Sequence, residues 1–265
     1  MTEIKASTGP KYARIYSVGS ATPSRVIDNE FLLQYIDSSD EWITQRTGIK
    51  ERRWVAEGEN IETLAMEAAS KAIERAGIDR AEIGAVILST ISHYHQTPAL
   101  APKLAYQLGI PDAAAYDISA ACAGFCYGLA QAEAIVRAGQ ATYVLLIAGE
   151  VISEITNLED RGTAFLFGDG AGAVIVGPSE TNGIGPVVWG SDGGQEGVIW
   201  QTADWHTAVE TGTFPKLGMD GRAVFKWATS FIARATKKCL DGAGLTPDQL
   251  DVFIPHQAND RITDT

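Results

Sequence analysis

The sequence has few cysteines, no long apolar run and no surplus of basic residues. Its three cysteines, Cys122, Cys126 and Cys239, are an odd number without the spacing of a disulfide framework, which suits a reducing compartment. No apolar run approaches the roughly 18 residues that span a bilayer, and the N-terminal residues lack the apolar core of a signal peptide. The net charge of −12 disfavours sequence-independent nucleic-acid binding, although a local basic patch could still bind an anionic partner. These absences favour a soluble cytoplasmic protein.

The pattern of apolar residues is that of an α/β protein. Residues 83–90 and 143–148 are almost uniformly apolar and predict strands buried on both faces, as in a parallel sheet. Apolar positions at helical spacing predict an amphipathic helix over residues 60–76. A long helix is expected over 221–240. Residues 181–220 are rich in glycine, tryptophan and turn residues, and predict a long loop excursion.

The chain is organised around a turn at Cys122. An apolar strand over residues 113–118 is followed by small residues and then by a helix that begins near Gly124. A thiol at such a turn lies at the positive end of the helix dipole, which favours the nucleophilic thiolate. The alternative is a small cysteine that only packs, which is the more common role of a lone intracellular cysteine.

An internal repeat gives Cys122 a candidate partner. Residues 76–90 and 243–257 share a helix end, an Ala-Gly pair, a polar linker and an apolar strand, which predicts two copies of one α/β unit. The strand of the second copy, residues 252–254, ends just before His256, at the edge where α/β folds place their chemistry. His256 could face Cys122 as a base or hydrogen-bond donor, or could be a core histidine satisfied by the backbone.

Residues 37–54 combine aromatic and basic side chains. Two tryptophans lie close in sequence to Arg46, Arg52 and Arg53. Because arginine pairs with phosphate and stacks on rings, the segment suits a flat, anionic ligand such as a nucleotide. A solvated basic segment fits the spacing equally well.

Two other motifs fail a test of spacing. His93 and His95 could ligate zinc, but no third or fourth ligand stands nearby, so no metal site is predicted. The glycines of residues 168–172 do not follow the G-x-G-x-x-G pattern and precede a strand rather than a helix. A nicotinamide site is therefore disfavoured.

Four motifs together resemble one enzyme family. They are RTGI at 46–49, AACAGF at 120–125, DRGTAFLFGDGAG at 160–172 and PHQANDRI at 255–262. In this order they resemble β-ketoacyl-acyl carrier protein synthase III, a condensing enzyme of the thiolase-fold superfamily, and most of all its actinobacterial members. The resemblance implies an α/β, thiolase-like fold with two pseudo-repeated halves in α-β-α-β-α layers. The first half is expected over residues 1–180, and the second, which is incomplete, over 181–265.

The resemblance implies a decarboxylative Claisen condensation that initiates fatty acid synthesis. Cys122 would take an acyl group from an acyl-CoA primer, and the carbanion formed from malonyl-acyl carrier protein on loss of CO2 would attack this thioester. His256 would stabilise the enolate. Acyl-CoA is a substrate, so neither a separate cofactor nor a metal is implied. The implied partners are acyl-CoA, malonyl-acyl carrier protein and a second copy of the chain in a homodimer.

Further residues match positions that bind substrate in the family. The implied roles are adenine stacking for Trp42 and Arg161, CoA binding in the same cleft for Arg46 and Thr47, pantetheine binding for Gly221 and Asn259, carrier-protein docking for Lys226, Gln257 and Arg261, and acyl-pocket lining for Thr97. Several relatives have Phe in place of Thr97. The smaller side chain predicts that primers branched or longer than acetyl fit.

The sequence departs from the family in one respect. The catalytic Asn of the family and its glycine-rich C-terminal strand have no counterpart up to Thr265. An incomplete chain of a normal synthase is therefore expected, with impaired decarboxylation and reduced stability. Two alternatives stay open: a starter-unit acyltransferase or ketosynthase of polyketide biosynthesis, and an inactive fragment that binds acyl-CoA or carrier protein.

Overall fold

The structure is a computed structural model that describes residues 4–265. This part of the chain divides into two compact units, each built from several segments. The first contains the described residues up to Pro23, Val55–Glu150 and Gly170–Gly185, and the second contains Ser24–Trp54, Val151–Asp169 and Pro186–Thr265. The expected halves, divided at residue 180, stay a prediction.

A five-stranded mixed sheet forms the centre of the first unit. Its strand order is β1-β7-β6-β4-β5. The strands are Tyr12–Ala21 (β1), Ile83–Ser89 (β4), Ala114–Ile118 (β5), Tyr143–Glu150 (β6) and Gly170–Ser179 (β7). The three strands predicted from apolar runs, β4, β5 and β6, run parallel as neighbours, whereas β7 runs antiparallel to both β6 and β1. The sheet is therefore mixed, because β7 follows β6 without a crossover helix.

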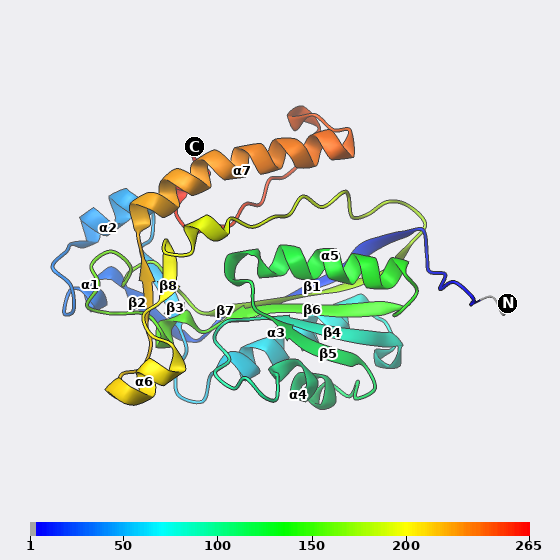
Figure 1. Cartoon of the computed structure of the whole chain (residues 1–265), viewed down its shortest axis with the longest axis horizontal. Coiled ribbons are helices and arrows are strands. Elements are labelled where there is room, and N and C mark those ends of the chain that lie inside the picture. Colours follow the sequence, from blue (N-terminus) through cyan, green and yellow to red (C-terminus); the bar gives the residue numbers. More distant parts are fainter. Residues whose placement is uncertain (1–3) are drawn as a thin grey trace. The chain divides into compact units, whose positions relative to one another are not determined.

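Helices cover both faces of this sheet. Gly124–Arg137 (α5) lies on one face, and Ile61–Ala76 (α3) and Leu100–Gln107 (α4) lie on the other (Figure 1). The predicted amphipathic helix is confirmed as α3, whose alanine-rich face is buried. Small side chains on this face allow a close approach to β1. At Gly19 of β1, any β-carbon would collide with the backbone carbonyl of Ala68.

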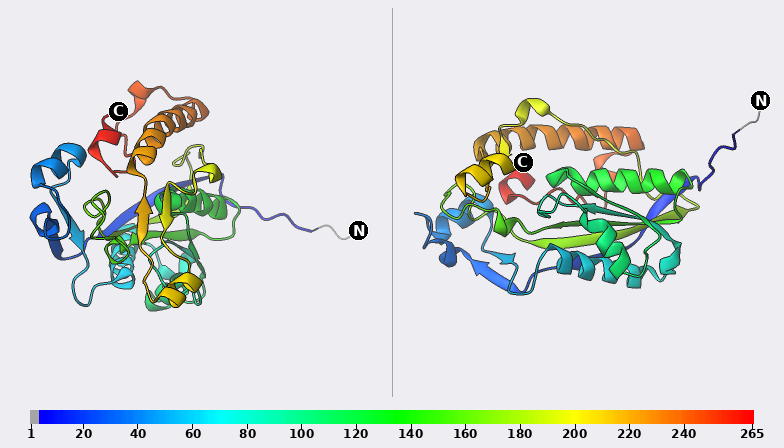
Figure 2. Two further views of the ribbon diagram at one scale, coloured as in Figure 1. Left: turned by 60° about the vertical axis from the view of Figure 1, so that its left-hand side comes forward. Right: turned by 60° about the horizontal axis from the view of Figure 1, so that its bottom comes forward.

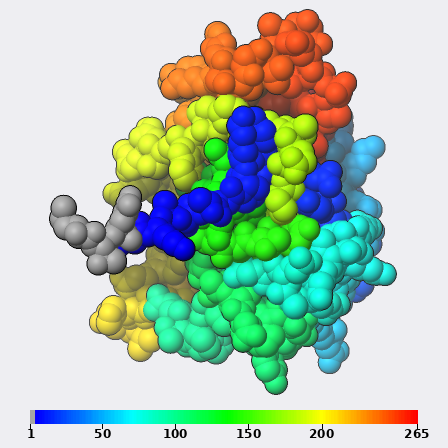
Figure 3. Space-filling model, turned by 90° about the vertical axis from the view of Figure 1, so that its right-hand side faces the viewer, coloured from blue at the N-terminus to red at the C-terminus, as the bar shows by residue number. Residues whose placement is uncertain are grey.

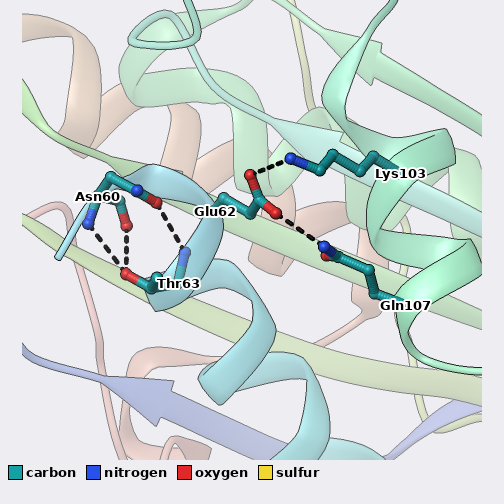
Figure 4. Close-up of polar contacts among 5 residues, drawn as sticks. All are labelled: Asn60, Glu62, Thr63, Lys103 and Gln107. Carbon is teal, nitrogen blue, oxygen red and sulfur yellow. Dashed lines mark hydrogen bonds and ion pairs between the residues drawn. The ribbon is translucent and has the colours of Figure 1, made fainter. Parts of the chain in front are cut away.

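Polar side chains fix the beginning of α3 and tie it to α4 (Figure 4). Asn60 accepts a hydrogen bond from the backbone N–H of Thr63 (3.0 Å), and the Thr63 hydroxyl accepts one from the backbone N–H of Asn60 (2.9 Å). This capping box satisfies donors that the first helical turn leaves unpaired. The Glu62 carboxylate accepts from Lys103 (2.6 Å) and from Gln107 (2.8 Å), which joins the two helices.

The segment before β1 packs closely against the end of α5, and glycines at positions 9 and 139 make this close approach possible. A β-carbon at Gly9 would meet the carbonyl oxygen of Arg137, where α5 ends. Gly139 follows with φ +69°, a left-handed conformation that glycine adopts without strain. Figure 3 shows the N-terminal segment (blue) lying against a green part of the surface.

The second unit has its own small core. The strands Arg25–Asp28 (β2) and Glu51–Trp54 (β3) form an antiparallel pair. The helices Asn29–Leu32 (α1) and Asp40–Thr47 (α2) lie between them in sequence. Their apolar side chains enclose a cluster with residues of the 160–169 loop, made of Ile27, Leu32, Ile36, Ile43, Trp54, Ala164 and Phe165.

The rest of the second unit follows residue 186. It contains a short antiparallel pair, Ile199–Gln201 (β8) and Leu217–Met219 (β9), and the helices Trp205–Thr211 (α6), Gly221–Ala243 (α7) and Asp260–Thr263 (α8). The predicted long helix is confirmed as α7, and Figure 2 shows α8 (red) beside it (orange). The predicted strand over residues 252–254 is wrong. These residues are exposed and irregular, because no described strand pairs with them.

Candidate active site

Cys122 lies on a strained turn in the first unit. β5 ends at Ile118, a single 3-10 turn spans Ala121–Ala123, and α5 begins at Gly124. Ala121 has φ +44°, a left-handed conformation that costs an alanine about 1–3 kcal/mol. A β-carbon at Gly124 would overlap the Ser89 side chain at the end of β4, so any larger residue there would force this region to shift. This backbone presents Cys122 as an exposed residue, and the prediction of a cysteine that only packs is not supported.

The electrostatics of Cys122 differ from the sequence expectation. Although the residue is exposed, its thiol is partly withdrawn from water, which raises the pKa of Cys122 above its ordinary value of 9.0. A backbone hydrogen bond opposes this rise, and the Glu150 carboxylate adds to it. The expected thiolate at the start of a helix is therefore replaced by a thiol that is protonated at neutral pH. Deprotonation needs a base or a bound substrate.

Glu150 belongs to a polar cluster that sequence reasoning missed. At the end of β6 it accepts hydrogen bonds from the Ser92 hydroxyl (2.6 Å), the Thr90 hydroxyl (3.1 Å) and the Ile91 backbone N–H (3.0 Å). Burial raises the pKa of Glu150 above its ordinary value, against the lowering effect of these bonds. The sequence could have pointed to Glu150, because it is an acidic residue at the carboxyl end of a buried strand, where α/β folds place catalytic and binding residues.

Trp42 carries an aromatic and cationic stack in the second unit. The guanidinium carbons of Arg46 and Arg161 lie 4.4 and 4.8 Å from the centroid of its ring. Phe165 meets the same ring edge-on, with centroids 5.7 Å apart. The fold thus brings together side chains from α2 and from the 160–169 loop, which are far apart in sequence. Two guanidinium groups beside an indole can hold an aromatic ring together with phosphate.

Arg52 is buried and anchors the 160–169 loop through Phe165. Only 6% of the residue is exposed. Its guanidinium donates to the carbonyl of Phe165 (3.0 Å), the side-chain oxygen of Asn29 (2.7 Å) and the carbonyl of Ile27 (3.2 Å). Burial lowers the pKa of Arg52, while nearby Asp28 raises it. Sequence reasoning placed Arg52 among the ligand-facing basic residues, whereas the structure buries it as a support.

Thr47 is also a buried support. Its hydroxyl donates to the carbonyl of Ile43 (2.8 Å) and accepts from the backbone N–H of Ile49 (3.1 Å). Gly48, which lies between Thr47 and Ile49, caps the end of α2 in a left-handed conformation with φ +76°. A β-carbon at Gly48 would overlap the Asp260 carboxylate, so α8 lies directly against the end of α2.

The PHQAN segment of residues 255–259 leads into α8 in the second unit. Asn259 caps this helix by accepting from the backbone N–H of Arg261 (2.9 Å). His256 lies just before it, and partial withdrawal of the imidazole from water lowers the pKa of His256 below its ordinary value of 6.5. His256 is therefore neutral at pH 7, which suits a hydrogen-bond donor better than a cation.

Two of the residues predicted to dock the carrier protein, Lys226 and Arg261, lie near the beginning of α7. The Arg261 guanidinium lies 5.6 Å from the centroid of the Phe225 ring, so it is held beside the first turns of the helix. Gly221 is the first residue of α7, and Lys226 is exposed on it. Gln257, on the preceding segment, is also exposed. The pairing of Cys122 with His256 joins the two units and stays a prediction.

Thr97 is exposed and precedes Pro98 through a cis peptide bond. Its role in lining an acyl pocket stays a prediction. His93 and His95 stack on each other with centroids 5.5 Å apart. Residues 4–265 contain no group of three or more His, Cys, Asp or Glu side chains placed to hold a metal ion. Within the same residues, no helix is long and apolar enough to cross a membrane.

Comparisons with known proteins agree on one family. Residues 116–193 match the family model described as 3-oxoacyl-[acyl-carrier-protein (ACP)] synthase III. The chain is 50% identical to β-ketoacyl-[acyl-carrier-protein] synthase III 1 of Streptomyces coelicolor, over 100% of the chain and 81% of that protein. It is 46% identical to the mycobacterial β-ketoacyl-[acyl-carrier-protein] synthase III of Mycolicibacterium paratuberculosis, over 100% of the chain and 79% of that protein.

Solved structures show the same fold. The priming β-ketosynthase of the R1128 polyketide biosynthetic pathway matches with a TM-score of 0.96 and 42% identity, over 99% of this chain and 79% of that one. The β-ketoacyl-[acyl carrier protein] synthase III of Thermus thermophilus matches with a TM-score of 0.88 and 40% identity, over 95% of this chain and 78% of that one. The expected α/β, thiolase-like fold is confirmed.

Proposed function

The chain belongs to the β-ketoacyl-[acyl-carrier-protein] synthase III family, and we propose that its condensation of an acyl-CoA primer with malonyl-acyl carrier protein passes through a thioester on Cys122. This reaction initiates fatty acid synthesis. The observation that carries the assignment of the nucleophile is the turn at Cys122. There a left-handed Ala121 and the tightly packed Gly124 present an exposed thiol between strand β5 and helix α5.

The first half-reaction transfers the acyl group. Cys122 loses its proton, and its sulfur attacks the thioester carbonyl of acyl-CoA. A bond forms between this carbon and the Cys122 sulfur, the bond to the CoA sulfur breaks, and CoA leaves as the thiol after taking up a proton. Backbone N–H groups at the start of α5, including that of Cys122, are suited to stabilise the oxyanion formed on the way.

The second half-reaction forms the carbon–carbon bond. Malonyl-acyl carrier protein loses CO2, and the electron pair left behind forms an enolate. The enolate carbon attacks the Cys122 thioester, a new carbon–carbon bond forms, and the Cys122 thiolate leaves to accept a proton. His256, kept neutral by its lowered pKa, donates a hydrogen bond to the enolate oxygen without protonating it outright.

Acyl-CoA is held by the Trp42 stack in this proposal. The adenine ring binds at Trp42 with Arg161, and Arg46 pairs with phosphate. Thr47 acts through its buried hydrogen bonds, and Gly221 and Asn259 border the pantetheine arm. No metal or separate cofactor takes part. We expect Arg161→Ala to raise the KM for acyl-CoA and to leave the KM for malonyl-acyl carrier protein unchanged.

Cys122→Ala and Cys126→Ala form a matched pair for testing the nucleophile. Both residues are exposed, and they lie four residues apart around the start of α5. With radioactive acyl-CoA, we expect the wild type and Cys126→Ala to retain label on the protein and Cys122→Ala to retain none. Label that persists in Cys122→Ala and disappears in Cys126→Ala would overturn the assignment.

The similarity to a polyketide priming β-ketosynthase supports a second candidate pathway. Both pathways use the same condensation, and they differ in the primer and in the carrier protein. Rates with acetyl-CoA and isobutyryl-CoA, each measured with fatty-acid and polyketide carrier proteins, distinguish them. Faster reaction with isobutyryl-CoA is expected because Thr97 is small, and a strong preference for acetyl-CoA would contradict its role in the acyl pocket.

The proposal includes a cytoplasmic homodimer. Three free cysteines suit a reducing compartment. β5 is an edge strand of the sheet and pairs only with β4 among the described strands, so its other edge can pair with β5 of a second copy. Sedimentation of the purified protein should give twice the chain mass of 28.3 kDa. A monomer at micromolar concentration would contradict the homodimer.

A further inference from the structure

The loop between β4 and α4 is held at both ends by carboxylates of neighbouring strands. It spans residues 91–99, and α4 begins directly after it at Leu100. Its first four residues are buried or partly buried, whereas residues 95–98 are exposed. Thr97, for which the sequence predicts a role in lining the acyl pocket, lies in this exposed part. The position of Thr97 therefore depends on how the two ends of the loop are fixed.

Glu150, at the end of β6, fixes the first end of the loop. Its carboxylate accepts hydrogen bonds from the hydroxyls of Thr90 and Ser92 and from the backbone N–H of Ile91. The Thr90 hydroxyl also accepts one from the backbone N–H of Ser92 (3.2 Å). Thr90 and Ser92 are only 6% and 2% exposed, so little water competes for these bonds. One carboxylate thus holds three successive residues.

Asp117 of β5 fixes the second end of the loop. Its Oδ2 accepts from the backbone N–H of Leu100 (2.9 Å), and its Oδ1 accepts from that of Ala101 (2.8 Å). The first turn of a helix leaves such donors unpaired, and Ala99, at the capping position of α4, has no side-chain oxygen to satisfy them. The negative charge of Asp117 also suits the positive end of the helix. A side chain of the sheet therefore fixes where α4 begins.

The loop leaves the sheet next to the Cys122 turn. Ser89, the last residue of β4, lies opposite Ile118, the last residue of β5. The backbone N–H of Thr90 donates to the Ile118 carbonyl (3.2 Å), so the two chain segments stay joined past the ends of their strands. One of them continues into the loop and the other into the turn that presents Cys122.

We propose that Asp117 and Glu150 are positioning residues for primer selectivity, and that they hold residues 91–99, with Thr97, in place as a wall of the acyl pocket. This inference rests on the proposed function and extends its acyl pocket to the two carboxylates that fix the loop. A wall discriminates between acyl chains of different size only where it does not yield to the larger ones. Loss of either anchor lets the wall move, so the enzyme should accept different primers at more similar rates.

Asp117→Asn and Asp117→Ala form a graded test of the second anchor. Asparagine retains one accepting oxygen, while its amide nitrogen cannot accept from the other backbone N–H, and alanine loses both bonds. Single-turnover acylation of Cys122 by acetyl-, isobutyryl- and octanoyl-CoA measures selectivity without the second half-reaction. The spread between the fastest and the slowest primer should shrink about tenfold in Asp117→Ala, because one methylene in a firm pocket changes a rate about 10- to 200-fold. Asp117→Asn should shrink it less.

Asp79→Asn is the matched control for Asp117→Asn. Asp79 also uses its carboxylate to accept from a backbone N–H at the start of a helical turn, that of Ala81 (3.0 Å). It belongs to the same unit but precedes β4, at the other end of that strand from the loop. Asp79→Asn should leave the spread of acylation rates unchanged.

Ser92→Ala weakens the first anchor without changing the charge near Cys122. Glu150→Gln would change both, because the carboxylate also raises the pKa of Cys122. Ser92→Ala removes a bond of 2.6 Å and keeps the carboxylate. Ser17→Ala is the matched control, because the buried Ser17 hydroxyl also donates over 2.6 Å, to the Ala72 carbonyl of α3. Both variants should lose similar stability in urea unfolding, and only Ser92→Ala should shrink the spread of acylation rates.

A double-variant cycle with Thr97→Phe shows whether Asp117 acts through the loop. The larger side chain in Thr97→Phe should narrow the pocket and slow acylation by isobutyryl-CoA. In the Asp117→Ala background the loop can move aside, so Thr97→Phe should slow the reaction several-fold less than it does in the wild type. Equal slowing in the two backgrounds would show that Asp117 does not act through the loop and would overturn its positioning role.

Two further results would overturn the proposal. One is an unchanged spread of acylation rates in both Asp117→Asn and Ser92→Ala, which decide the question even where Asp117→Ala does not fold. The other is an equal shrinkage in Ser17→Ala, which would assign the effect to a general loss of stability. Failure of the proposed function is separate, because it would appear as absence of label on Cys122 in the wild type with every primer.

Discussion

Replacement of Arg52 by leucine tests how the second unit supports the Trp42 stack. Arg52 donates three hydrogen bonds, to the carbonyls of Ile27 and Phe165 and to the side-chain oxygen of Asn29. The bond to Phe165 fixes the loop that carries Arg161 at Trp42. Leucine has a similar apolar stem but no donor, so all three oxygens would lose this partner inside the protein.

The expected loss of stability follows from these three acceptors. Each buried acceptor left without its donor costs about 1–3 kcal/mol. Burial of the leucine side chain returns about 1.5–3 kcal/mol. The three acceptors together cost about 3–9 kcal/mol, so the net destabilisation lies between about 0 and 7.5 kcal/mol, with a midpoint near 4 kcal/mol. Arg52→Lys should fall between leucine and the wild type, because a compact ammonium group does not span acceptors that the guanidinium fork reaches together.

Urea unfolding of Arg52→Leu and Arg53→Leu measures the effect. Arg53 is the next residue of β3, and its side chain is partly exposed, with one long contact of 3.5 Å to the Ser24 carbonyl. Arg53→Leu should change the unfolding free energy by about 0.5 kcal/mol or less, as exposed substitutions do. In folded Arg52→Leu, the KM for acyl-CoA should also rise. Equal stability of the two variants would refute the reasoning.

Three further predictions concern the first unit. Glu150→Gln should speed alkylation of Cys122 by iodoacetamide at pH 8, because loss of the carboxylate charge lowers the thiol pKa, and an unchanged rate would contradict this coupling. Hydrogen bonds from Lys103 and Gln107 hold the pKa of Glu62 below its ordinary value of 4.5 in the folded state. The stability that Glu62 contributes is therefore present above pH 4.5 and is lost as the pH falls through the folded pKa. The unfolding free energy measured at pH 7, 4 and 3 should fall more steeply for the wild type than for Glu62→Gln. Gly19→Ala should destabilise by about 1–3 kcal/mol in thermal unfolding, because its β-carbon meets the Ala68 backbone, and a wild-type melting temperature would show that α3 can move away.

The strands and helices of the sheet could be predicted where apolar pattern and burial agree. β4 and β6 are runs of buried side chains, and such runs have few other structures available. Residues 252–254 are equally apolar, yet they form no strand, because strand formation needs a neighbour that the pattern within the run does not specify. Sequence thus predicted individual elements better than it predicted their pairing.

The sequence predicted which residues belong to the candidate site, but it did not predict their burial or their contacts. The Cys122 turn and the Trp42 segment followed from local sequence, whereas the contact of Arg161 with Trp42 depends on how the 160–169 loop folds. Arg52 was assigned to the ligand-facing surface and Glu150 was missed, because charged side chains are rarely buried. Only the folded chain supplies the carbonyl and hydroxyl groups that make their burial possible.

The pKa shifts of Cys122 and His256 have the same kind of cause, and both favour the neutral form of the side chain in the resting enzyme. Partial withdrawal from water raises the pKa of Cys122 and lowers that of His256, so both side chains are neutral near pH 7. In the proposed mechanism Cys122 is acylated when decarboxylation occurs, so the acid that could protonate the enolate before it attacks is a charged imidazolium at His256. A neutral imidazole donates a hydrogen bond and leaves the carbanion free for carbon–carbon bond formation. In the proposed mechanism the lowered pKa of His256 therefore favours carbon–carbon bond formation, while the raised pKa of Cys122 slows the acylation that precedes it.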